Sequence, residues 1–266
     1  MKRTHRTLVR ASLAAFLVAA PATSQVAAAS QEPAAATPQI TAADVPVPQA
    51  PAPYDHPRLP DEPDKVLFHP NSEVEAAAGG LRDGRRHGPW VLYDRGGTVE
   101  ARGSFADYHR TGEWTYYHPD GTRREQGVFV EGQRQGPWYA WYTNGTPRSA
   151  GEVERGLMTG SWVEWSRDGA LLNAGQKKLG EREGRSTWFH PNGRPSRTGD
   201  YRSGVENGEW REFHPNGQLF QRGRYVMGLP FGRWLAWHPN GQPLSAGVYG
   251  PDGQVGVGTR WFDDGT

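Results

Sequence analysis

Four histidines recur in one local setting and are the residues with the clearest capacity for chemistry. His118, His190, His214 and His238 each precede a proline and stand three residues before a glycine. Histidine nitrogens bind zinc, but a site needs several ligand atoms about 2.0–2.3 Å from one ion. The four histidines are separated by multiples of 24 residues, and equivalent residues of successive β-hairpins lie about 9.6 Å apart. We therefore predict turn residues and no metal site.

Acidic residues occur in pairs, such as Glu152 with Glu154 and Asp263 with Asp264. Glycoside hydrolysis needs two carboxylates across a substrate cleft, and paired surface carboxylates without a cleft are usually solvated. The chain has no P-loop, nucleophile elbow or dinucleotide fingerprint. Asn144-Gly145-Thr146 matches a glycosylation sequon but occupies a turn position. We expect no catalytic residues, no cofactor and no enzymatic activity.

A 24-residue repeat positions all of these side chains. Glycines recur at residues 97, 121, 145, 169, 193, 217, 241 and 265, and a second set stands nine residues earlier, from Gly88 to Gly256. Such a period is typical of repeat architectures. The segment His214–Gly217 predicts a type I turn with a glycine bulge between two short strands. The predicted fold is all-β: an elongated, twisted, single-layer antiparallel meander of about eight 24-residue β-hairpins, open, with a closed barrel as the alternative.

Aromatic residues form rows at the same period. A first row stands seven residues before each turn-closing glycine, and Ser186 and Gly258 interrupt it. A second row, four residues before that glycine, is Tyr93, Tyr117, Trp141, Trp165, Phe189, Phe213, Trp237 and Trp261. A third, on the return strand, is Phe105, Phe129, Val153, Tyr201, Tyr225 and Tyr249, interrupted by Lys177. The first two rows differ by three residues, so either a bulge precedes the tryptophan or both faces carry aromatics.

The tryptophans of these rows are the candidate site residues, either as a structural ladder or as binding aromatics. They are Trp90, Trp114, Trp138, Trp141, Trp162, Trp165, Trp210, Trp234, Trp237 and Trp261. Burial of large rings stabilises a sheet that has little aliphatic content, whereas exposed rings could stack on sugars or anchor a protein. A further glycine, six residues after each turn, from Gly103 to Gly247, is expected to make room for a neighbouring ring.

The segments before the repeats have different compositions. Residues 1–29 resemble a cleaved signal peptide, with a basic start, an apolar run from Ala11 to Ala20 and a cleavage motif at Ala27–Ala29 or, less well matched, Ala22–Ser24. Residues 30–65 are a Pro/Ala-rich linker, read either as a semi-rigid spacer or as disorder. Residues 66–87 are interpreted as a degenerate capping repeat, because Ser72 lies 25 residues before Gly97. Residues 88–266 form the predicted repeat domain.

Composition narrows the possible functions. The chain has 35 Gly, 22 Pro, 11 Trp and no Cys, and only 35% hydrophobic residues, which disfavours a conventional layered core and excludes disulfides. The formal net charge is +1, and it is −3 without the four basic residues of the signal segment. Nucleic-acid binding and polybasic docking to a membrane are therefore not expected.

The segments GEWTYYHPDG, GPWYAWYTNG, GEWREFHPNG and GRWLAWHPNG resemble the MORN repeat in its bacterial second variant. The resemblance covers about residues 88–265 and implies an elongated sheet of β-hairpins with a binding or scaffolding role. Many bacterial members are classed as YwqK-type antitoxin proteins, and an export signal argues against a cytosolic antitoxin. Lipid association is known for other members, and no residue here supports it.

Together these patterns predict a non-catalytic protein exported to the periplasm or the extracellular space. We expect it to bind an unidentified protein partner or to act as a scaffold. Binding of carbohydrate or cell wall through the Trp and Tyr rows is the alternative.

Overall fold

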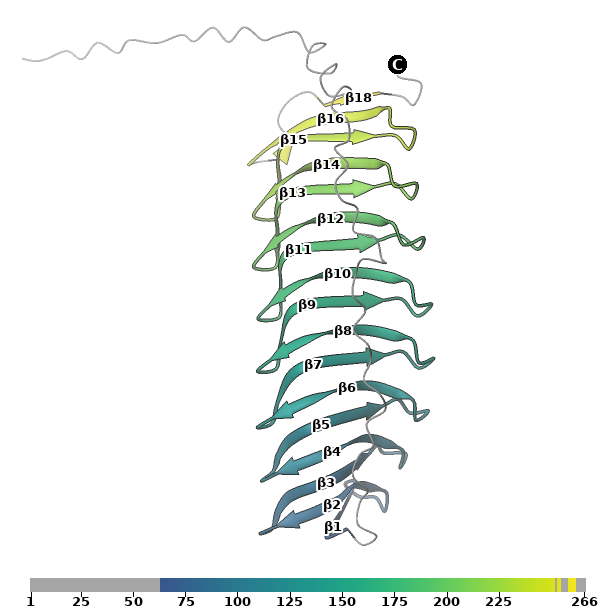
Figure 1. Cartoon of the computed structure of the whole chain (residues 1–266), viewed down its shortest axis with the longest axis vertical. Coiled ribbons are helices and arrows are strands. Elements are labelled where there is room, and N and C mark those ends of the chain that lie inside the picture. Colours follow the sequence, from purple (N-terminus) through teal and green to yellow (C-terminus); the bar gives the residue numbers. More distant parts are fainter. Residues whose placement is uncertain (1–62, 252, 255–257, 262–266) are drawn as a thin grey trace, which may run out of the picture. The chain divides into compact units, whose positions relative to one another are not determined.

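The computed structural model describes residues 63–251, 253–254 and 258–261. These residues form one antiparallel β-sheet of hairpins stacked along the long axis of the sheet (Figure 1). The described residues contain no helix, so none of sufficient length and hydropathy to cross a membrane is found among them. The signal-peptide prediction and almost all of the linker prediction lie outside the described residues.

Strands of nine and eight residues alternate through the repeats. Their bounds are β1 (Lys65–Phe68), β2 (Glu75–Arg82), β3 (Arg85–Tyr93), β4 (Val99–Ala106), β5 (His109–Tyr117), β6 (Arg123–Val130), β7 (Gln133–Trp141), β8 (Pro147–Glu154), β9 (Leu157–Trp165), β10 (Leu171–Lys178), β11 (Glu181–Phe189), β12 (Pro195–Arg202), β13 (Val205–Phe213), β14 (Leu219–Val226), β15 (Leu229–Trp237), β16 (Pro243–Gly250), β17 (Gly253–Gln254) and β18 (Thr259–Arg260).

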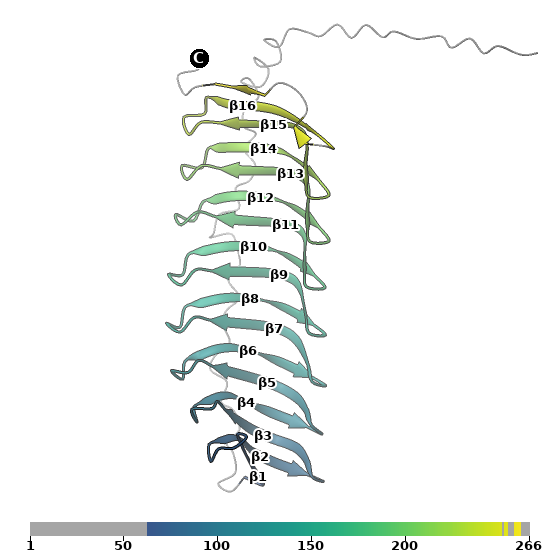
Figure 2. The same ribbon diagram turned by 180° about the vertical axis from the view of Figure 1, so that it is seen from behind.

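Each strand from β1 to β16 pairs with the next one along the chain, and β16 also pairs with β17 and β18. Within the described ranges, β1 pairs only with β2, and β17 and β18 pair only with β16. The sheet is therefore an open meander, as predicted, and not a closed barrel. The views from front and back show the same succession of hairpins (Figure 2).

One edge of the sheet consists of the predicted type I turns. In the turn after β5, Gly121 donates its N–H to the carbonyl of His118, and His118 donates to the carbonyl of Thr122. Gly121 has a φ of 84°, the left-handed conformation of a glycine bulge. The turns that close at Gly97, Gly145, Gly169, Gly193, Gly217 and Gly241 repeat these hydrogen bonds.

The other edge consists of two-residue turns of type I′. Glu131 and Gly132, between β6 and β7, both have positive φ (49° and 78°), which defines this turn type. Gly132 also donates its N–H to the carbonyl of Arg110, one hairpin earlier. Equivalent bonds join the other I′ turns from Tyr108 to Gly228 to the preceding hairpin. Each I′ turn from Tyr108 to Gly228 is therefore bonded to its neighbour as well as within its own hairpin.

A bulge precedes every tryptophan of the first row. Between β6 and β7, Gly127 pairs with Trp138 but Val128 pairs with Gln135, so two residues, Gly136 and Pro137, are extra. Gly136 has a φ of 75°, which only glycine adopts without strain. Bulges of this kind bend a strand and increase its twist. The opening glycines of the repeat are therefore the bulge positions.

Both faces of the sheet carry aromatic residues, so both explanations for the three-residue spacing apply. Trp138 belongs to a cluster that includes Trp90, Trp114 and Trp162. Trp165 belongs to a separate cluster with Phe189. We call the face of the first row, which carries Trp90, Trp114, Trp138, Trp162, Trp210 and Trp234, the tryptophan face.

Residues 66–87 form most of β1, all of β2 and the start of β3. The turn between β1 and β2 explains the phase shift seen in the sequence, because His69 donates its N–H to Val74, five residues on, where the repeats span four. The contact between Gly79 of β2 and Trp90 of β3 is otherwise that of a regular repeat. The short strand β1 is the outermost strand at this end of the sheet.

Candidate binding surfaces

The histidine row lies along the type I edge and joins successive turns. The Nε2 atoms of His118, His190, His214 and His238 are 2.8–3.2 Å from the carbonyl oxygens of Trp141, Phe213, Trp237 and Trp261, each 23 residues further on. Tyr142 replaces histidine in its turn and donates its hydroxyl to the equivalent carbonyl, that of Trp165. Among the described residues no group of three or more His, Asp or Glu is placed to hold a metal. The histidines are therefore links between repeats.

Asparagines of the same turns add a second link. The side-chain amides of Asn144, Asn192 and Asn216 donate to the carbonyls of Arg167, Pro215 and Pro239 in the next turn. Asn144 also accepts from the backbone N–H of Thr146. Asn144, the asparagine of the sequon, thus binds its own turn through the amide oxygen and the next turn through the amide nitrogen.

Five of the six first-row tryptophans are buried between a glycine and a cation. A Cβ atom placed on Gly103 would lie 2.2 Å from the ring of Trp114, which confirms that this glycine makes room for the ring. On the other side, the guanidinium of Arg110 lies 4.8 Å from the ring centroid, a cation–π distance. The indole N–H of Trp114 donates to the carbonyl of Ser104.

The same arrangement recurs along the face with different cations. Arg86, Arg134, Lys177 and Arg197 lie over Trp90, Trp138, Trp162 and Trp210. Trp90, Trp114, Trp138, Trp162 and Trp210 are all buried, and Trp234 is half-buried. At the five buried rings, burial on one side and a cation on the other leave no open ring face for a sugar. The sequence signal for the cations over Trp90, Trp114 and Trp138 is the 24-residue spacing of Arg86, Arg110 and Arg134, which did not enter the sequence-based prediction. Arg182 stands at the same phase and lies over Trp188.

The return-strand row completes this aromatic ladder. Phe105 packs edge-on against both Trp90 and Trp114, with ring centroids 5.8 and 5.2 Å apart. Tyr225 does the same between Trp210 and Trp234, at 5.8 and 5.0 Å. Edge-to-face pairs at these distances stabilise a fold beyond the area that they bury. Lys177 replaces an aromatic in this row, and burial lowers its pKa below the ordinary lysine value.

The two interruptions of the first row have different consequences. At Ser186, the ring of Trp188 on the same strand fills the gap, 5.8 Å from Trp210 and 5.9 Å from Tyr201. At Gly258 no such ring is present in the described part of β18. A hollow of about 280 Å³ lies there, lined by Trp234, Tyr249 and Gly258 among others. Trp188 was not singled out from the sequence.

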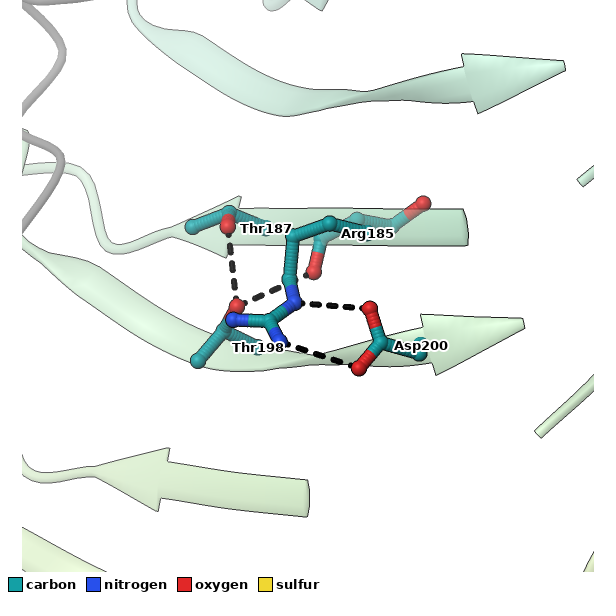
Figure 3. A network of polar contacts seen from close by, with 5 residues as sticks. Arg185, Thr187, Thr198 and Asp200 are labelled. Carbon is teal, nitrogen blue, oxygen red and sulfur yellow. Dashed lines mark hydrogen bonds and ion pairs between the residues drawn. The ribbon is translucent and has the colours of Figure 1, made fainter. Parts of the chain in front are cut away.

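Cross-strand polar pairs hold β11 to β12 beside the Ser186 interruption (Figure 3). Arg185 binds both carboxylate oxygens of Asp200, at 2.8 and 2.9 Å, and the Asp200 contact raises the pKa of the guanidinium. The hydroxyls of Thr187 and Thr198 lie 3.0 Å apart. These residues stand directly opposite one another in the register, where cross-strand pairs stabilise a sheet most. The network is therefore a cross-strand ion pair beside a pair of hydroxyl groups, and it joins β11 to β12.

The second row lies on the opposite face and is partly covered. Trp141 and Trp165 are buried, Trp141 stacking on Tyr139 with Arg123 over its ring. Trp237 and Trp261 are half-buried. The ten candidate tryptophans therefore divide between two faces, and most of them belong to the core.

The three most exposed of the large apolar side chains in the described residues, Met227, Leu179 and Leu229, lie along the type I′ edge, in the half of the sheet after β8 (the left edge in Figure 1). We call these three and three further exposed side chains of the same edge the apolar turn stripe: Leu157, Leu179, Val205, Met227, Leu229 and Phe231. Leu179 is 68% exposed, Met227 80% and Leu229 60%. Leu157 lies against the turn of Leu179, and Val205 against the turn of Met227, so neighbouring hairpins contribute adjoining side chains.

Leu179 and Met227 have an unusual backbone as well as exposed side chains. Their φ angles are 52° and 51°, in a region that Gly, Asn and Asp adopt far more readily than Leu or Met. The sequence could have indicated this surface, because two-residue hairpin turns normally carry polar or glycine residues. It was missed because the I′ turns were not assigned residue by residue.

The fold and these surfaces define the class: an open, single-layer β-hairpin repeat protein. A family model described as a MORN repeat variant matches residues 110–131 and 206–227, which occupy equivalent positions four repeats apart. These matches confirm the expected resemblance, and the chain contains repeats of the MORN variant. No curated protein matches it in sequence.

Two solved structures show a weak likeness. One is a GtfA/B complex bound to UDP and GlcNAc, at 15% identity over 55% of this chain and 29% of that chain, with a TM-score of 0.22. The other is TcdB2-TccC3-Cdc42, at 12% identity over 69% of this chain and 10% of that chain, with a TM-score of 0.21. The chain thus spans under a third of either structure, and TM-scores of this size carry no argument.

Proposed function

We propose that this protein is an exported, non-catalytic binding protein that holds a protein partner through the apolar turn stripe. The observation that carries the proposal is the pair Leu179 and Met227, which combine left-handed backbone with high exposure of apolar side chains. Left-handed backbone costs a non-glycine residue roughly 1–2 kcal/mol. Neither the strain nor the exposure contributes to the fold, so a binding role accounts for both.

The geometry of the stripe suits an extended protein surface better than a small molecule. Its residues come from four successive I′ turns, and turns of this sheet lie about 9.6 Å apart. The stripe therefore extends over about 29 Å along the edge of the sheet. Exposed apolar patches of this kind mark protein contacts.

A pull-down from an envelope fraction tests the proposal. Leu179→Asn combined with Met227→Asn removes the two most exposed apolar side chains of the stripe and keeps a residue that suits the turn. We expect the bound partner to be lost. The matched control is Leu172→Asn with Val248→Asn, because these apolar residues are also exposed but lie outside the stripe. Equal loss with both pairs, or retention with both, would contradict the assignment of the surface.

Export is proposed from the N-terminal sequence and has its own test. We expect the mature protein from the envelope to begin near Ser30, after Ala27–Ala29. N-terminal sequencing that finds Met1 or Lys2 in purified protein would contradict export, without bearing on the binding surface.

Carbohydrate binding receives less support from the geometry. Five of the six first-row rings, all except the half-buried Trp234, lie buried between a glycine and a cation, and stacking on a sugar requires an open ring face. Co-sedimentation with polysaccharide that is abolished by Trp237→Ala, in the half-buried second row, would revive it. No observation favours an antitoxin role or lipid association.

A further inference from the structure

The return-strand row of aromatic residues ends at Tyr249 in β16. In the earlier repeats a ring of this row packs between two first-row tryptophans, and Phe129 lies 6.1 Å from Trp114 and 5.5 Å from Trp138. Tyr249 packs edge-on against Trp234, with ring centroids 6.2 Å apart. The second neighbour of Tyr249 is therefore set by the residue at the eighth first-row position.

The backbone at the eighth first-row position keeps the register of the other repeats. Thr259 in β18 pairs with Ala246 in β16, which is the pairing found one residue after a first-row tryptophan, as at Tyr139. Gly258 therefore stands opposite Gly247, where the other repeats place a tryptophan opposite its glycine. The eighth repeat keeps the glycine of this pair and has a second glycine instead of the indole.

The hollow of about 280 Å³ lies at this position. Its lining includes Gly247, Tyr249 and Gly258, the residues beneath, beside and at the position of an eighth indole. The half-buried ring of Trp234 lines it as well. An apolar cavity of about 150 Å³ is large enough to bind benzene, so this hollow has room for a compound with two fused rings.

We propose that this hollow binds an aromatic ring of the size of indole, edge-on to Tyr249 and on the backbone of Gly247. The bound ring has the place that a tryptophan side chain has in the other repeats, where edge-to-face contacts stabilise the ladder. None of the described residues that line the hollow belongs to the apolar turn stripe. The inference therefore does not depend on a partner for that stripe.

The polar residues of the hollow define the charge of the ligand. Arg260 lines the hollow and stands two residues after Gly258, so both residues lie on the same face of the sheet. A guanidinium beside the ring suits a neutral or anionic aromatic compound, since arginines cover buried rings of the tryptophan face. It disfavours a cationic ligand by charge repulsion. Gln221 and Ser245 also line the hollow, and their side-chain oxygens are acceptors for an N–H group such as that of indole.

Titration of the full chain with indole, followed by ligand-observed NMR, tests the site. Gly258→Trp places an indole of the chain itself in the hollow. We expect this variant to weaken indole binding by about tenfold or more and to raise Tm, because the ring completes the ladder. Gly258→Leu occupies the same space with a smaller side chain and should weaken indole binding as well. It keeps the test valid if the tryptophan variant fails to fold.

Val248→Trp is the matched control, because Val248 is exposed, does not line the hollow and lies on the opposite face from Gly247 and Tyr249. This variant should leave indole binding unchanged. Absence of indole binding to the unaltered protein, or undiminished binding to both Gly258 variants, would overturn the proposal. Binding of methyl glucoside instead of indole, abolished by Gly258→Trp, would assign the hollow to a sugar and would also overturn it.

N-acetyltryptophan amide in the same titration identifies the source of the ring. Tighter binding of this compound than of indole supports the proposal with a side chain of another protein as the ligand. Weaker binding than that of indole supports it with a free aromatic compound as the ligand.

Discussion

Gly103 lies directly beneath the indole of Trp114, so that a Cβ atom at Gly103 would fall 2.2 Å from the ring. Arg110 covers the other side of the same ring at 4.8 Å. The pair is repeated at Gly79, Gly127, Gly151, Gly199 and Gly223 with the tryptophans that follow them. A single-layer sheet has no second layer against which to pack. Here the ring lies on the backbone of the neighbouring strand, and the absence of a side chain at glycine makes that possible.

Gly103→Ala should destabilise the sheet by roughly 1–3 kcal/mol, because the methyl group must displace the Trp114 ring or the strand. Trp114→Ala alone should cost roughly 3–5 kcal/mol. The double variant should cost clearly less than the sum, since the methyl group then occupies space that the ring has left. Urea unfolding measures all three.

The control is a glycine that is needed for its left-handed backbone and has no ring beside it. Gly232 has a φ of 71°, and no neighbouring atom lies within 4 Å of the position that an added methyl group would take. Gly232→Ala should cost roughly 1–2 kcal/mol from left-handed strain, and its cost should add to that of Trp114→Ala. If the costs of Gly103→Ala and Trp114→Ala also added in the double variant, the Trp114 ring and Gly103 would not interact.

His214→Ala should destabilise the array by about 1 kcal/mol, because the Trp237 carbonyl loses the hydrogen bond from Nε2. His214→Tyr should retain most of the stability, since Tyr142 makes the equivalent bond in its own turn. Thermal unfolding with and without Zn²⁺ also distinguishes a histidine that joins two turns from one that binds a metal. A rise in Tm with Zn²⁺ that depends on His214 would contradict the structural role.

Lys177→Phe should stabilise the protein by roughly 1 kcal/mol, because it restores an aromatic to the return-strand row and removes a partly buried charge. Lys178→Phe, at the exposed neighbouring position, should give no gain. The advantage of Lys177→Phe should also shrink as the pH rises toward the lysine range. Burial lowers the pKa of Lys177 in the folded state, so the unfolded state binds more protons there and the unaltered protein gains stability with pH. A pH-independent advantage would indicate that the charge is not the cause.

The fold could be predicted because the period, the turn residues and the aromatic rows all specify the same hairpin. His-Pro-Asn-Gly determines a turn locally, and 24-residue spacing determines how turns stack. The partners of His214 and Trp114 could not be predicted in the same way. They lie in the next hairpin, and the bulge at Gly112 and its equivalents alters the alternation of faces that a regular strand would have.

The candidate site was predicted less well than the fold. The tryptophans were singled out correctly as a row, but their division between two faces and their covering cations depend on the bulge and on Arg110 and its equivalents. The apolar turn stripe was not predicted. Leu179 and Met227 stand where local propensity favours a polar residue, and such departures from the local rule mark functional positions.

Leu179→Asn and Met227→Asn should each raise the free energy of unfolding by about 1 kcal/mol while weakening partner binding. Asparagine tolerates the left-handed turn position better than leucine or methionine, so the backbone strain is relieved. Glu131→Asn is the matched control, because Glu131 occupies the same turn position with a φ of 49° but lies outside the apolar turn stripe. It should raise stability without affecting binding, as measured by urea unfolding and by retention of the envelope partner. Loss of stability in the Leu179 and Met227 variants would mean that these side chains pack in the fold and are not kept exposed for a partner.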